Sequence, residues 1–162
     1  MPFTEPGVQV YLRDDRGVLT APLRYQGRID HFVIPAGFDT DFASVPKRLQ
    51  GLVQSIGKWT RAAIAHDWFC TGLANGDCPV SARDADGIFR RMMRESDVGF
   101  ITRWCMWTAV RWAALKNPAR RPGWIRDAPL VVAITAAVLT AAVLAAAGVA
   151  AYAVARLICH LT

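Results

Sequence analysis

Three titratable side chains in the middle of the sequence have the types and spacing of an acid–base centre: His66, Asp67 and Asp86. Histidine is the side chain best suited to accept or release a proton near neutral pH. When one of its ring nitrogens donates a hydrogen bond to a carboxylate, the other nitrogen is left to act as a general base. We therefore predict His66 and Asp86 as a catalytic pair, with Asp67 beside them.

Helical periodicity supports this pairing. On the helix predicted over residues 59–70, at about 100° per residue, His66 shares its inward face with the small or apolar residues Trp59, Ala62, Ala63 and Cys70. Asp67 lies at the edge of that face. On the next predicted helix, over residues 82–95, Asp86 borders the apolar side. If the two helices pack antiparallel, Asp86 can accept a hydrogen bond from His66.

Two further residues are candidates for the site. Asp41 lies in a loop rich in proline and glycine, residues 35–46, where it serves either as a turn or cap acceptor or as part of the site. Arg111 falls on a helix face, within the helix predicted over residues 100–116, that is otherwise formed by Phe100, Trp104, Thr108, Trp112 and Leu115. It either extends to the edge of that face or pairs with a carboxylate, for which Asp41 is the obvious candidate.

The elements that must position these residues are strands followed by helices. Short β-rich segments separated by turn-forming residues predict antiparallel strands over residues 8–12, 18–25 and 29–34. Helices are predicted over residues 47–53, 59–70, 82–95 and 100–116. This order predicts the α+β class: a small N-terminal antiparallel β-sheet followed by a helical layer.

The C-terminal segment has a different character, because residues 128–155 contain no charged side chain. As a helix, residues 129–154 would be roughly 39 Å long, which exceeds the hydrocarbon thickness of about 30 Å. We predict one transmembrane helix. The predicted division of the chain is a soluble domain, a basic juxtamembrane linker, the transmembrane helix and a short tail, over residues 1–118, 119–128, 129–155 and 156–162.

The charges that flank this helix predict its orientation. Lys116, Arg120, Arg121 and Arg126 precede it, and only Arg156 follows it. Positive residues favour the cytoplasmic side, so the N-terminal domain is expected in the cytoplasm as part of a single-pass membrane protein. The formal net charge is +6. Basic residues next to a membrane helix attract anionic lipid, and this role accounts for the positive charge without nucleic acid. A lipid membrane is the expected partner, and nucleic acid is not expected.

Four segments carry a resemblance to a known family: residues 33–46, 62–68, 85–89 and 109–111. Over roughly residues 8–115 the chain resembles the phage and prophage family known as domain of unknown function 1353. The resemblance implies that the protein is encoded by a bacteriophage or prophage, and it implies no particular activity.

A second resemblance concerns mechanism. A His-Asp pair on one helix followed by Asp-x-x-Phe on the next is similar to phospholipase A2 domains. It implies that His66 is the base, that Asp86 orients it and that Asp67 binds Ca²⁺. Calcium needs six to eight oxygen ligands, so Asp41 would have to contribute as well.

Two hypotheses follow for the function. The first is a metal-assisted His-Asp hydrolase that acts on an ester at the membrane surface. The alternative is a non-catalytic membrane adaptor or structural accessory protein, in which the polar residues form a buried network. A cleft with room for water at His66 favours the enzyme, and a sealed network favours the alternative.

Overall fold

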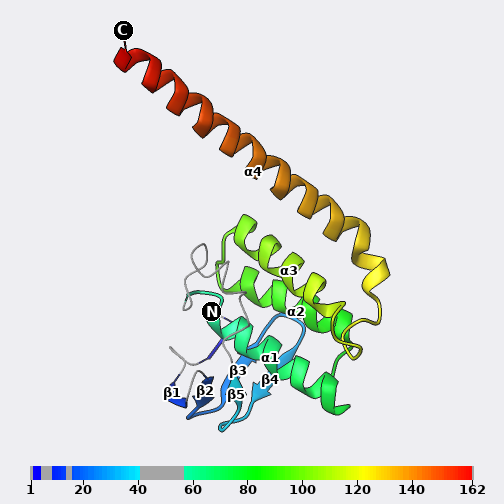
Figure 1. Ribbon diagram of the computed structural model, residues 1–162. Coiled ribbons are helices and arrows are strands. Elements are labelled where there is room, and N and C mark those ends of the chain that lie inside the picture. Colours follow the sequence, from blue (N-terminus) through cyan, green and yellow to red (C-terminus); the bar gives the residue numbers. More distant parts are fainter. Residues whose placement is uncertain (1, 5–8, 14–15, 41–56, 162) are drawn as a thin grey trace. The chain divides into compact units, whose positions relative to one another are not determined.

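The N-terminal part of the chain forms two small antiparallel sheets (Figure 1). The computed structural model describes residues 2–4, 9–13, 16–40 and 57–161. Its strands are β1 (Val10–Arg13), β2 (Arg16–Leu19), β3 (Leu23–Gln26), β4 (His31–Ile34) and β5 (Asp39–Thr40). One sheet has the order β1-β2-β5, and the other pairs β3 with β4.

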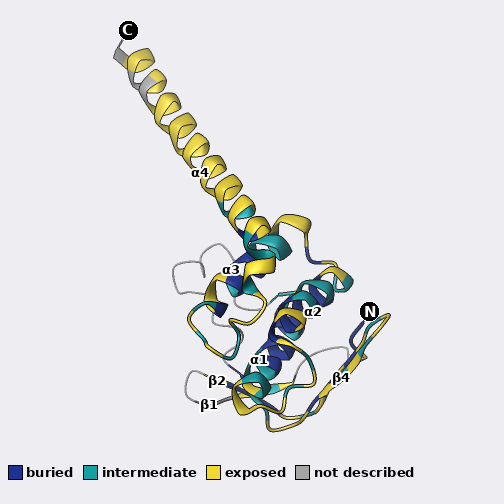
Figure 2. Ribbon diagram, turned by 90° about the vertical axis from the view of Figure 1, so that its right-hand side faces the viewer, coloured by how far each residue is buried: buried dark blue, intermediate teal, exposed yellow. Residues whose placement is uncertain are grey.

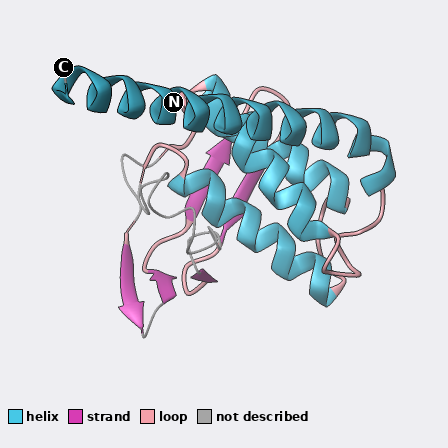
Figure 3. Ribbon diagram, turned by 45° about the horizontal axis from the view of Figure 1, so that its top comes forward, coloured by secondary structure: helices cyan, strands magenta, loops and turns pink. Residues whose placement is uncertain are grey.

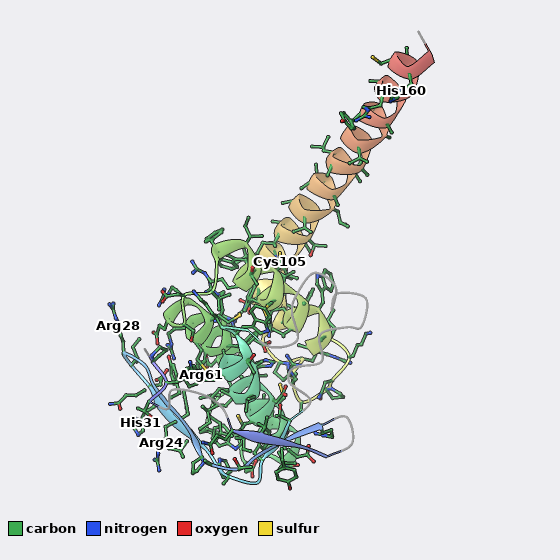
Figure 4. All side chains as sticks on the ribbon, turned by 90° about the vertical axis from the view of Figure 1, so that its left-hand side faces the viewer. Arg24, Arg28, His31, Arg61, Cys105 and His160 are labelled. Atoms are coloured by element: carbon green, nitrogen blue, oxygen red, sulfur yellow. The ribbon has the colours of Figure 1, made fainter. Side chains whose placement is uncertain are left out.

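The strand predicted over residues 18–25 is in fact two strands, β2 and β3, because the chain bends at Thr20 and Ala21 before Pro22. Proline has no N–H group to donate to a ladder, which favours a break at this point. In the β3–β4 hairpin, alternate residues Leu23 and Tyr25 face the core. Arg24, Arg28 and His31 project from the outer side of the hairpin (Figure 4).

Three helices follow the strands: α1 (Thr60–Asn75), α2 (Ala82–Glu95) and α3 (Phe100–Ala114). They confirm three of the predicted helices and the α+β class (Figure 3). Helix α1 continues five residues beyond the predicted end and stops at Gly76, whose φ of 82° is left-handed and therefore suits glycine. The helix predicted over residues 47–53 lies outside the described residues.

Helix α2 begins at a side-chain cap and buries one face. The Ser81 hydroxyl accepts a hydrogen bond from the Asp84 backbone N–H at 3.2 Å, which satisfies one of the free amides of the first turn. The residues of α2 that are buried recur at helical spacing: Ala82, Ala85, Asp86, Ile88, Phe89, Met92 and Met93. Asp86 is therefore part of the interior face of α2.

Helix α1 is the central element of the core. Ala62, Ala63, Ile64 and Ala65 are consecutive and each is fully buried, so α1 is covered all round rather than on one face. In Figure 1, α1 lies between the strands and α2, and Figure 2 shows both helices as largely buried. The alanines allow neighbouring elements to approach the α1 backbone closely, and this brings side chains of α2 within reach of His66.

The last helix, α4 (Trp124–Leu161), differs from the others in length and exposure. Its most apolar window of 18 residues has a mean hydropathy of 2.5, and the helix is long and apolar enough to cross a membrane by length and composition. Most of its residues are exposed (Figure 2). The chain divides into two compact units, Met1–Trp124 and Ile125–Thr162.

Candidate functional site

The predicted contact between α1 and α2 is confirmed. His66 Nε2 lies 2.6 Å from Asp86 Oδ1, and the two residues are 3% and 0% exposed. Burial by itself raises the pKa of Asp86. Three neighbours outweigh the effect of burial and lower the pKa of Asp86 to about 2. They are His66, through its hydrogen bond and its charge, then Arg120 through its charge, and Arg111 through its hydrogen bond. At neutral pH the carboxylate therefore only accepts, and His66 Nε2 must carry the proton.

Two arginines complete the cluster. Arg111 Nη1 donates to Asp86 Oδ2 at 2.8 Å. Arg120 Nη2 donates to Asp86 Oδ1 at 3.0 Å and to the Val110 carbonyl at 3.1 Å. Both oxygens of Asp86 are thus engaged by donors from α1, from α3 and from the segment that follows α3. We call His66, Asp86, Arg111 and Arg120 the His–Asp–Arg network.

The structure shows which of the two roles considered for Arg111 is correct. Its side chain is fully buried, so it does not extend to the edge of the helix face. The carboxylate that it binds is Asp86 rather than the expected Asp41, which lies outside the described residues. The face predicted for Arg111 is not uniformly buried either, because Phe100 is 65% exposed and Trp112 is 39% exposed.

Arg120 is the member of the network that sequence reasoning missed. Its position in the sequence predicts a basic residue next to the membrane. In the structure its side chain is 11% exposed and lies against Asp86. Arg120 belongs to a turn between α3 and α4, where no periodicity indicates which way a side chain points. No signal in the single sequence distinguishes it from Arg121 beside it.

Backbone and cap hydrogen bonds hold this turn in place. Asn117 accepts hydrogen bonds from the backbone N–H groups of Arg120 and Arg121 at 3.0 Å. The guanidinium of Arg121 donates to the Leu115 carbonyl at 2.9 and 3.1 Å. Trp124 Nε1 donates to the Arg111 carbonyl at 2.7 Å. The segment is folded back on the C-terminal end of α3, and this directs Arg120 towards Asp86.

Asp67 lies beside the end of β5. The hydroxyl of Thr40, which is fully buried, donates to Asp67 Oδ2 at 2.6 Å. The residue after Thr40 is Asp41, the other predicted calcium ligand, which is not among the described residues. Within the described part of the chain, no group of three or more His, Cys, Asp or Glu side chains can hold a metal ion. These donors do not suffice for Ca²⁺, so we derive no step through it.

Cys70 is the neighbour of His66 on the next turn of α1. Its sulfur lies 3.7 Å from Nδ1 and 3.8 Å from Nε2. A thiol that donates a hydrogen bond to Nδ1 lies in the plane of the ring and is much farther from Nε2 than from Nδ1. The two observed distances are nearly equal, so the thiol of Cys70 does not donate a hydrogen bond to Nδ1. Burial raises the pKa of Cys70 to about 12. Cys70 is therefore a neutral thiol packed on the imidazole and is not an activated nucleophile.

Among the described residues, the arrangement is a buried cluster. Phe89 packs on the imidazole with a ring-centroid distance of 4.8 Å, and Cys70 contacts it as well. A general base must come within hydrogen-bond distance of the group that it deprotonates, whereas His66 is 3% exposed. Of the two arrangements considered from the sequence, this one corresponds to the buried network.

Comparison with known proteins adds a family. The family described as "Protein of unknown function (DUF1353)" matches residues 18–110, which is more than half of the chain. The match includes His66, Asp67 and Asp86 and ends just before Arg111. Neither a curated protein nor a solved structure matches the chain. The chain therefore belongs to the DUF1353 family.

Proposed function

We propose that this protein is a non-catalytic, membrane-anchored adaptor or structural accessory protein, in which the His–Asp–Arg network locks the domain to the segment that leads into α4. Helix α4 crosses the bilayer once, with the N-terminal domain on the cytoplasmic side. One observation carries the proposal. The side chains of all four residues of the network are at most 11% exposed, and both carboxylate oxygens of Asp86 accept hydrogen bonds.

The energetics of such a cluster favour a structural role. A buried carboxylate loses its hydration, and this loss is offset only when charged donors replace the water. Asp86 has three hydrogen-bond donors among the described residues, and two of them are guanidinium groups. They come from α1, from α3 and from the turn before α4, whereas Asp86 itself is on α2. Removing one partner from a buried pair of this kind costs about 3–5 kcal/mol, so the network makes the packing of these elements interdependent.

The network also bears on anchoring. Arg120 precedes the first residue of α4 by only four positions, and Trp124 itself packs on Trp112 with a ring-centroid distance of 5.4 Å. A domain that is linked to its membrane helix through a hydrogen-bonded segment is held near the bilayer surface. This is a useful property for an adaptor that presents a surface to partners at the membrane.

The test compares stability with activity. The full chain is purified in detergent as the natural sequence and as Asp86→Asn, and both are assayed for thermal unfolding and for fatty-acid release from phosphatidylglycerol vesicles with Ca²⁺. We expect Asp86→Asn to unfold at a markedly lower temperature because two arginines lose their counter-charge. We expect neither form to release fatty acid. Release by the natural chain that disappears in His66→Ala, with unchanged thermal stability, would contradict the proposal.

A second candidate is the metal-assisted hydrolase, related in mechanism to phospholipase A2 and encoded by a phage or prophage. One observation favours it: Thr40 at the end of β5, the residue before Asp41 in the sequence, donates a hydrogen bond to the carboxylate of Asp67. If this candidate is correct, fatty-acid release requires Ca²⁺, and both Asp67→Asn and Asp41→Asn abolish it while leaving the folded domain intact.

A further inference from the structure

The N-terminal half of α3 exposes an unusual apolar surface. Phe100 is 65% exposed and Ile101 is 75% exposed, and Trp104 lies on the same side one turn later. At about 100° per residue, the three side chains fall within an arc of about 100° on the helix. We call Phe100, Ile101 and Trp104 the α3 patch.

Arginines border the α3 patch. The guanidinium of Arg90 lies 4.0 Å from the ring centroid of Trp104, and that of Arg103 lies 5.2 Å from the ring centroid of Phe100. Arginine stacked on an aromatic ring keeps its positive charge, which attracts anions; Arg103 Nη1 also donates to the Val98 carbonyl at 3.4 Å. Aromatic rings combined with arginines are the composition that proteins use at the boundary between acyl chains and headgroups.

The position of the patch in the chain indicates what covers it. Helix α3 ends at Ala114, and a hydrogen-bonded turn of nine residues connects it to Trp124, the first residue of the helix long enough to cross a membrane. Trp124 is fixed to α3 by its contact with Trp112 and by its hydrogen bond to the Arg111 carbonyl. Because α3 is only about 22 Å long, Trp124 lies within about one helix length of the α3 patch, and the apolar helix begins at this residue.

From these observations we propose that the α3 patch docks on the surface of an anionic bilayer, with Phe100 and Ile101 among the acyl chains and Arg103 at the phosphate groups. The proposal rests on the membrane anchoring proposed above. It adds that the domain touches the lipid through a second site, in addition to α4, and so has a defined face towards the membrane and another face towards the cytoplasm.

The experiment uses the full chain reconstituted in vesicles of phosphatidylcholine and phosphatidylglycerol. A genetically encoded, polarity-sensitive fluorescent amino acid replaces either Ile101 or Tyr11. Tyr11 is the control because it is 50% exposed and belongs to β1, which lies on the other side of α1 and α2 from α3 (Figure 1). Flotation of the vesicles measures anchoring separately, and brominated lipids measure contact of the probe with acyl chains.

We expect the probe at position 101 to emit at shorter wavelength and to lose about half of its emission or more to brominated lipid, because its side chain is buried in the acyl boundary. The probe at position 11 should show neither effect. Replacing phosphatidylglycerol with phosphatidylcholine should weaken the effect at position 101. If the chain floats with the vesicles but both probes behave alike, the docking proposal is wrong and anchoring stands. If the chain does not float, the anchoring proposal fails and docking falls with it.

Discussion

Arg120 and Arg121 are neighbours of identical type that the structure assigns to different environments, and they allow a direct test of the His–Asp–Arg network. The side chain of Arg120 is 11% exposed and its Nη2 lies 3.0 Å from Asp86 Oδ1. Arg121 is exposed and donates only to the Leu115 carbonyl among the described residues. Arg120→Met and Arg121→Met remove the same charge at almost the same distance from the membrane, so both have the same effect on the positive flank of α4.

The expected difference follows from the partners that are lost. A hydrogen bond to a charged group contributes about 1.5–3 kcal/mol, and a hydrogen bond between an exposed group and a neutral carbonyl contributes about 0.5–1.5 kcal/mol at most. Asp86 keeps His66 and Arg111 in the Arg120→Met variant, so the cost should be about 2–3 kcal/mol. For a domain of this size, 1 kcal/mol shifts the midpoint of thermal unfolding by about 3–4 °C.

We therefore expect Arg120→Met to unfold at a temperature roughly 6–12 °C below that of the natural chain. Arg121→Met should stay within about 6 °C of it. The assay is near-ultraviolet circular dichroism of the full chain in detergent, because tryptophans packed in the domain report its tertiary structure whereas the far-ultraviolet signal is dominated by helix content. Equal midpoints for the two variants would show that Arg120 does not bind Asp86 and would refute the network.

Three further predictions concern pH and reactivity. The pKa of Asp86 is lowered from 3.8 to about 2, so its contribution to stability, about 2 kcal/mol, is present above pH 4 and lost as the pH falls towards 2; urea unfolding should show this acid loss in the natural chain and less of it in Asp86→Asn. The pKa of Tyr25 is raised from 10 to about 12 by burial and by its hydrogen bond to Glu95. Its contribution is therefore present below pH 10 and lost as the pH rises towards 12, and Tyr25→Phe should be less stable at neutral pH but should lose less between pH 10 and 12. Because burial raises the pKa of Cys70 to about 12, maleimide at pH 7 should label this thiol much more slowly in the folded chain than after unfolding in guanidinium, as mass spectrometry of the peptide would show; equal labelling rates would contradict the raised pKa.

Part of the fold and of the site followed from local patterns. Apolar residues at helical spacing predicted α2 with the bounds that the structure shows. The same spacing predicted that His66 and Asp86 point inward from neighbouring helices. A connection as short as the one between α1 and α2 brings consecutive helices together, so the contact between these two residues could be predicted from their faces alone. The length and composition of the C-terminal segment likewise predicted a long apolar helix.

The errors have equally specific causes. The segment that contains β2 and β3 is β-rich throughout, and a pattern of composition does not show that Thr20 and Ala21 bend the chain. Arg111 was correctly placed on a partly apolar face, but a helix face does not identify the carboxylate that it meets. In the structure this is Asp86, 25 residues earlier in the chain.

The sequence by itself predicted α1, α2 and α3 and the directions in which His66 and Asp86 point, because side-chain direction on a helix depends only on its local repeat. Only the tertiary structure decided that the pair is closed off by two arginines. Arg120 comes from an aperiodic turn, where the direction of a side chain depends on how the turn folds back on α3. That depends on hydrogen bonds and packing from distant residues, and these do not appear as a pattern in the sequence around Arg120.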